Sequence, residues 1–259
     1  MKYVPKIDPK QGLRYVLLLQ LAVAGLLMVT QLFGLLPTWS QDKVELPSGP
    51  ISPGDQQREY RVDRSLPGLV TQDGPAALPL PETFADRLTF EEVTLEGRGT
   101  GLLVTGQIDA RASERFANHL EDMGQTPDFI ALHSPGGLVH EALLIGRHIR
   151  AEELPTAVLA GAMCASSCPY MLAGGVARTV SLQGLVGLHQ HYYDQPRYMP
   201  VMFAVEDIQT GQGETMAFLM EMGVDPSLML YSLKTPPEQI YALVEEELTA
   251  TGIATEIID

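Results

Sequence analysis

The chain has few basic side chains. Its 259 residues include 17 Lys and Arg against 32 Asp and Glu, which gives a formal net charge of −15. Four of the basic residues precede residue 15, so the rest of the chain is more acidic still. Proteins that bind nucleic acid hold its phosphates with clustered Lys and Arg side chains. Nucleic acid is therefore not an expected partner.

Cysteine is also scarce, because Cys164 and Cys168 are the only two. Two cysteines without suitably spaced histidines make a poor zinc site, so we expect no metal and no other cofactor. In an oxidising compartment the four-residue separation would permit a disulfide. The alternative is a pair of small buried thiols that pack against their surroundings.

One long hydrophobic run is present, over residues 15–36, and it carries no charge. At about 1.5 Å per residue a helix of this length crosses a hydrocarbon core of roughly 30 Å. Because the basic side chains precede it, the positive-inside tendency places residues 1–14 in the cytoplasm and the rest outside. This predicts a single-pass protein of the inner (cell) membrane with a periplasmic C-terminal domain. A cleaved signal peptide is the alternative, although its apolar run is usually shorter.

The composition changes after this run. Residues 37–85 are rich in Pro, Gly, Asp and Ser and show little hydrophobic periodicity, which predicts a flexible linker. Residues 86–259 contain the regular apolar patterns of a folded domain. We therefore expect one globular domain, held away from the membrane by a tether.

Strand and helix patterns alternate within this domain. Expected strands are 100–108, 129–132, 157–160, 179–180 and 185–188, and expected helices are 112–123, 138–151, 169–173 and 205–222. Alternation of this kind predicts an α/β fold in which crossover helices connect the strands of a parallel sheet. The strands are continuously apolar, which is typical of a sheet covered on both faces.

Three short motifs suggest nucleophilic catalysis by serine. Ser166 lies between the apolar run 157–160 and the expected helix 169–173, and His189 directly follows the expected strand 185–188. The pair Gly136-Gly137 can turn backbone N–H groups toward a developing oxyanion, because glycine tolerates a positive φ. Acyl transfer needs these three elements: an exposed hydroxyl, a base within hydrogen-bond reach and oxyanion donors.

Each of these assignments has an alternative. Ser166 is an ordinary small residue of a turn if the neighbouring motifs are ignored, and Ser167 is a second candidate nucleophile. His191, two residues beyond His189, would point to the same side of an extended chain. His133 and His140 flank the Ser134-Pro135-Gly136-Gly137 segment, where a packing role is expected.

The three motifs, in this order, resemble those of the Clp protease proteolytic subunit and its ClpP/crotonase superfamily, over about residues 99–193. The resemblance implies a ClpP-like fold with Ser166 as nucleophile and His189 as base. It also implies that the amide of Ser167 and the Gly136-Gly137 pair stabilise the oxyanion. The helix 205–222 lies where the family carries an extension that pairs rings of subunits, so a homo-oligomer is a further expectation.

The chain departs from the family at the third catalytic residue. Ile240 occupies the position where the resemblance places an aspartate. Glu238 and Asp225 are the nearby carboxylates that remain as candidates. A backbone carbonyl or a water molecule would also serve to orient the imidazole, with some loss of rate.

These features lead to a first hypothesis, a membrane-anchored ClpP-like serine peptidase that acts on peptides or unfolded protein segments outside the cytoplasm. The alternative is a catalytically decayed ClpP-like binding or scaffolding module, which the Ile240 substitution favours. An acyl-CoA enzyme of the crotonase type would leave Ser166 idle. A Ser-Lys mechanism like that of signal peptide peptidase A fits poorly, because Lys43 and Lys234 are the only lysines beyond the apolar run.

Overall fold

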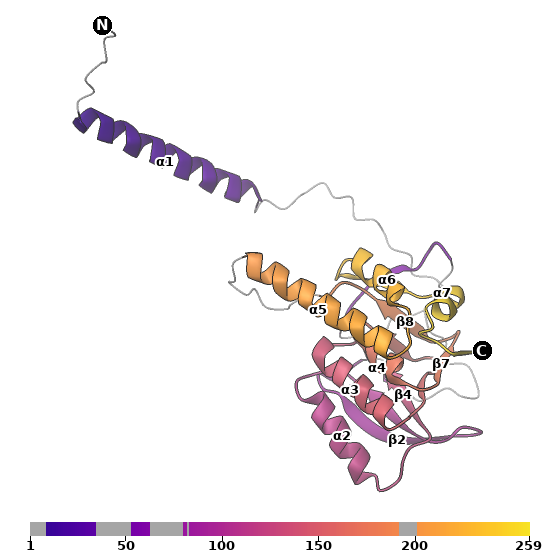
Figure 1. The fold of residues 1–259 in the computed structure, drawn as a ribbon. Coiled ribbons are helices and arrows are strands. Elements are labelled where there is room, and N and C mark those ends of the chain that lie inside the picture. Colours follow the sequence, from indigo (N-terminus) through magenta and orange to yellow (C-terminus); the bar gives the residue numbers. More distant parts are fainter. Residues whose placement is uncertain (1–8, 35–52, 63–79, 82, 192–200) are drawn as a thin grey trace. The chain divides into compact units, whose positions relative to one another are not determined.

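The computed structural model describes residues 9–34, 53–62, 80–81, 83–191 and 201–259. The chain divides into two units, Met1–Glu45 and Leu46–Asp259. In the first unit, helix α1 (Pro9–Gly34) contains a segment, Lys10–Val29, that is long and apolar enough to cross a membrane (Figure 1). The apolar helix expected over 15–36 is thus present, although it begins earlier, and residues 35 and 36 lie outside the described part.

The larger sheet of the second unit has six strands within the described residues, in the order β10-β7-β5-β4-β3-β2. These are β2 (Thr89–Leu95), β3 (Gly99–Thr105), β4 (Phe129–His133), β5 (Thr156–Val158), β7 (Arg178–Ser181) and β10 (Glu256–Ile258). All neighbouring pairs are parallel except β2 and β3. Strands β4, β5 and β7 are buried along their whole length, as in a sheet covered on both faces. The predicted parallel α/β architecture is confirmed.

A smaller sheet contains four described strands in the order β1-β9-β8-β6. These are β1 (Gln57–Glu59), β6 (Met163–Ala165), β8 (Leu185–Leu188) and β9 (Gln239–Ala242). Strands β6 and β8 are parallel, whereas β9 is antiparallel to both of its neighbours. A parallel bridge between Ser134 and Cys164 connects the end of β4 to β6, so the two sheets meet there.

Helices cover the larger sheet, and α2 and α3 lie side by side next to its strands in Figure 1. The described helices of this unit are α2 (Ala112–Asp122), α3 (Val139–Ala151), α4 (Cys168–Gly174), α5 (Val201–Glu221), η1 (Pro226–Leu228), α6 (Met229–Lys234) and α7 (Glu245–Ala250). Every residue of α4 is buried. A β-carbon on Gly174 would lie 2.3 Å from the Gly146 carbonyl oxygen, so α4 contacts α3 through backbone atoms.

Two sequence predictions need correction. The expected linker 37–85 is too long, because β1 pairs with β9 and Tyr60 and Leu80 are buried in the folded unit. The expected strand 157–160 does not lead to Ser166. Strand β5 ends at Val158, and the unpredicted strand β6 of the second sheet precedes the serine.

Candidate active site

Ser166 occupies a sharp turn between β6 and α4. Its φ is +62°, a left-handed conformation that is uncommon for residues other than glycine and often marks a functional site. Its N–H donates to the carbonyl oxygen of Gly187 at 2.9 Å, which ties the turn to the end of β8. The turn therefore holds the hydroxyl at the edge of the smaller sheet.

His189 follows β8, and β8 is paired in parallel with β6, which precedes Ser166. Ser166 and His189 therefore lie at the carboxyl ends of two neighbouring strands. The register pairs Ala165 with Gly187, and the Oγ of Ser166 lies 2.7 Å from the Nε2 of His189. The hydroxyl of Ser232 donates to the His189 carbonyl at 2.7 Å, which fixes the backbone of the histidine. The structure thus brings together the two residues predicted as nucleophile and base.

The imidazole of His189 is only 2% exposed. Burial, with a smaller contribution from His191, lowers its pKa from 6.5 to about 4, although a hydrogen bond to the backbone of Pro237 and the charge of Glu238 act in the opposite direction. The ring is therefore neutral at pH 7, and a neutral imidazole can accept the serine proton. Proline has no N–H, so the backbone group of Pro237 in this interaction is its carbonyl.

The structure distinguishes the candidates for a third catalytic residue by what each of them contacts. Ile240 is fully buried in β9, within a small apolar cluster that also contains Met163 and Leu185. Asp225 has a different role, because its carboxylate accepts a hydrogen bond from the N–H of Ser227 at 2.8 Å and caps η1. Of the two predicted carboxylates, Glu238 is the one that acts on His189.

Gly136 and Gly137 approach the serine turn closely, with φ of +92° and +146°. A β-carbon on Gly136 would lie 2.6 Å from the Ser166 β-carbon and 2.8 Å from the Ser167 nitrogen. The N–H of Gly136 donates to the Oγ of Ser134, so it is not directed at a substrate. Among the described hydrogen bonds, none uses the N–H of Gly137 or of Ser167. These two amides remain as the candidate oxyanion donors.

Cys164 and Cys168 form a disulfide with a Cα–Cα distance of 5.1 Å. Both cysteines are fully buried. The bond joins β6 to the first residue of α4, and Ser166 lies midway between its ends. The predicted alternative of two free thiols is excluded.

The competing serine and histidines have other partners. The Ser167 hydroxyl donates to the Gly137 carbonyl at 3.2 Å, and His191 forms a hydrogen bond with the Tyr170 hydroxyl at 2.9 Å. His133 is buried and accepts a hydrogen bond at Nδ1 from the Met163 N–H, and burial lowers its pKa to about 4. The geometry therefore favours the Ser166–His189 pair over these alternatives. Lys234 ends α6, and Lys43 lies outside the described residues.

Sequence reasoning missed Tyr60 and Pro237. Tyr60 follows β1, and its ring centroid lies 4.9 Å from that of His189. The sequence offers little signal, because residues 57–60 are Gln, Arg, Glu and Tyr and show no apolar alternation, although Arg58 and Tyr60 are buried in the structure. The Pro-rich composition around this segment concealed it.

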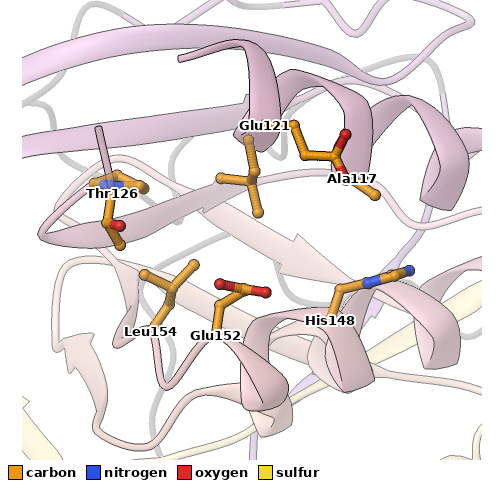
Figure 2. A pocket seen from close by; sticks show the side chains of 8 residues that line it. Ala117, Glu121, Thr126, His148, Glu152 and Leu154 are labelled. Carbon is orange, nitrogen blue, oxygen red and sulfur yellow. The ribbon is translucent and has the colours of Figure 1, made fainter. Parts of the chain in front are cut away.

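A cavity between α2 and α3, of about 180 Å³, lies elsewhere in the fold (Figure 2). Its lining residues are Ala117, Leu120, Glu121, Thr126, Pro127, His148, Glu152 and Leu154. None of the residues described around Ser166 contributes to it, and its three charged or imidazole side chains are exposed. It is therefore separate from the candidate active site.

No protein-family model and no curated protein matches this sequence.

Proposed function

We propose that the chain is a membrane-anchored serine peptidase with Ser166 as nucleophile and His189 as general base. The observation that carries the proposal is the 2.7 Å contact between the Ser166 Oγ and the His189 Nε2, at a strand-to-helix turn with a left-handed serine. A hydroxyl nucleophile needs a base within hydrogen-bond reach, and His189 is placed to be that base. A left-handed backbone at a residue other than glycine is found most often at functional sites.

The reaction follows from this arrangement. The Ser166 Oγ attacks the carbonyl carbon of a peptide bond while its proton moves to the His189 Nε2, and the amides of Gly137 and Ser167 hold the oxyanion. The intermediate collapses, the C–N bond breaks and the imidazolium returns the proton to the leaving amine. A water molecule, deprotonated by His189, then hydrolyses the acyl-serine ester and frees the hydroxyl.

The carbonyl of Pro237 and the carboxylate of Glu238 take the part of the missing aspartate in this proposal. Both raise the pKa of His189, and a group that raises the pKa of an imidazole stabilises its protonated form. The imidazolium exists only while the proton is in transit. The Pro237 carbonyl and the Glu238 carboxylate would therefore stabilise the reaction states in which His189 is protonated more than they stabilise the resting enzyme.

Two features support a location outside the cytoplasm. Helix α1 is long and apolar enough to be a membrane anchor, and basic residues flank its N-terminal side. The Cys164–Cys168 disulfide is typical of an oxidising compartment. Substrates would then be peptides, unfolded segments or the ends of membrane proteins. A ClpP/crotonase-like ancestry is part of the same proposal, supported by the order of the motifs on a parallel sheet.

A decayed binding or scaffolding module is the second candidate, and the buried Ile240 is the observation in its favour. An active-site probe separates the two. Full-length protein in detergent is treated with a fluorophosphonate, and the labelled residue is identified by mass spectrometry. We expect labelling at Ser166, its loss in Ser166→Ala and its retention in Ser167→Ala. Folded wild-type protein that takes up no label would favour the binding module.

A further inference from the structure

Four strand ends converge on His189 in the smaller sheet. Strand β6 leads into Ser166, β8 leads into His189, and β9 begins one residue after Glu238. The fourth strand, β1, ends at Glu59, which pairs with Gln239 at the start of β9. Antiparallel pairing therefore delivers the residue that follows β1 to the same edge as the candidate catalytic pair.

That residue is Tyr60, and it contacts both sides of the site. Its N–H donates to the Glu238 carbonyl at 3.0 Å. Its ring packs on the His189 imidazole with a centroid distance of 4.9 Å and an interplanar angle of 51°. Its hydroxyl donates to the carbonyl of Pro135, the residue before Gly136. Tyr60 is itself 8% exposed, so the contact is part of the packed interior.

This site needs a group that controls the imidazole. In a serine triad the acid fixes the orientation of the histidine and stabilises its charged form. Here the position expected for that acid holds Ile240, whose apolar side chain can form no hydrogen bond. The carbonyl of Pro237 and the charge of Glu238 act on the imidazole through polar interactions, and the ring of Tyr60 adds a packing contact that restricts the plane of the imidazole.

We propose that Tyr60 is a positioning residue, which holds the His189 imidazole against Ser166 and links it to the Pro135-Gly136-Gly137 turn. This inference rests on the proposed function. The segment concerned, residues 57–60, belongs to the chain between the apolar helix and the main body of the domain. Part of the supposed tether is therefore a component of the active site.

The pH dependence of the reaction reports on this contact. Burial of the ring and the charge of His191 lower the pKa of His189. The backbone of Pro237 and the charge of Glu238 raise it. Removal of the Tyr60 ring opens the imidazole to water and so reduces its burial, while the side chains of His191 and Glu238 and the carbonyl of Pro237 are retained. The pKa of His189 should then rise from about 4 toward its ordinary 6.5, because burial is the largest cause of the shift.

The test compares full-length variants in detergent by their rate of fluorophosphonate labelling between pH 4 and pH 8. We expect Tyr60→Ala to slow labelling at pH 8 by roughly ten- to hundred-fold, the loss that small misplacements of a catalytic group cause. Its acid limb should also move upward. Tyr60→Phe keeps the ring and loses the Pro135 bond, so it should keep the wild-type midpoint with a smaller loss of rate.

The chain offers a matched control. Phe84 belongs to the same apolar cluster as Tyr60, is 9% exposed, and packs on His133 with a centroid distance of 4.7 Å. Phe84→Ala should lower the melting temperature as Tyr60→Ala does and leave the pH midpoint unchanged. A Tyr60→Ala profile that coincides with that of Phe84→Ala would overturn the positioning role. If Tyr60→Ala does not fold, Tyr60→Leu decides by the same criterion.

Failure of the inference is distinguishable from failure of the proposed function. Absence of labelling in wild type would reject the peptidase. Titration of the histidine ring protons by NMR would still test the contact, because the His189 pKa should rise in Tyr60→Ala whether or not the protein is an enzyme. Normal wild-type labelling with an unchanged His189 titration in Tyr60→Ala would reject the positioning role alone.

Discussion

A β-carbon on Gly136 would lie 2.6 Å from the β-carbon of Ser166. The other nearest atoms are the carbonyl oxygen of Ala165 and the nitrogen of Ser167, both backbone atoms of the nucleophile turn. A change of side-chain rotamer cannot relieve contacts with backbone. The absence of a side chain at residue 136 is therefore a condition for the observed position of Ser166.

We predict that Gly136→Ala displaces the Ser166 turn. The φ of +92° adds backbone strain to the steric conflict, and we expect a loss of about 1–3 kcal/mol in the free energy of unfolding. Labelling at Ser166 should fall by at least tenfold. Gly213→Ala is the matched control, because a β-carbon there meets no atom within 4 Å. It should leave labelling unchanged, and equal losses in the two variants would contradict the argument.

The Cys164–Cys168 disulfide should also stabilise the turn that contains Ser166. Reduction, or the double substitution of Cys164 and Cys168 by Ala, releases the constraint between β6 and α4. We expect the free energy of unfolding to fall by about 2 kcal/mol, the lower part of the usual range because the loop is short. Slower labelling of Ser166 should accompany the loss, and both effects are measured with and without dithiothreitol. Reductant should have no further effect on the double variant. Full labelling of the reduced protein would show that the turn holds its geometry without the bond.

The sequence was enough to select Ser166 and His189 as a pair, but it predicted only some of the helices and strands around them. Strand β8 has the predicted bounds, and α2 and α3 lie within one residue of the predicted bounds at each end, because their apolar periodicity is strong. Strands β1 and β9 were missed, since each is short and is stabilised by its partner more than by its own composition. Tyr60 could not be assigned to the site either, because it follows β1 and is placed there only by the pairing of β1 with β9. Asp225, one of the two open candidates for the third catalytic residue, has a local partner, because its carboxylate accepts a hydrogen bond from the Ser227 N–H.

Buried histidines should make the fold sensitive to acid. Burial lowers the pKa of both His133 and His189 to about 4, whereas an unfolded chain protonates histidine near 6.5. Unfolding therefore takes up protons between these values, so stability is full above pH 6.5 and falls as the pH decreases toward 4. We expect a loss of roughly 1–3 kcal/mol for each histidine, measured by urea unfolding at pH 7.5 and pH 5.

Two variants test the assignment of this acid sensitivity. His133→Gln removes one buried titrating ring and should weaken the pH dependence of the free energy of unfolding. His148→Gln changes an exposed histidine of α3 and is the control for the substitution itself. Identical pH dependence in all three proteins would assign the acid sensitivity to other groups.

An aspartate placed at residue 240 should not create a Ser-His-Asp triad. Ile240 is fully buried beside Met163, Ala165 and Leu185, and its Cγ1 would lie 2.6 Å from a β-carbon on Gly187. A carboxylate there would be removed from water without an established donor, at a cost of several kcal/mol. We therefore expect Ile240→Asp to lower the melting temperature sharply and to reduce labelling, while Ile240→Val loses about 1 kcal/mol and keeps the labelling rate. A stable Ile240→Asp protein that is labelled faster than wild type would show instead that residue 240 can reach the imidazole. Tyr60 and Pro237 would then be a partial substitute for the acid, and their substitution should matter less in the Ile240→Asp background than in wild type.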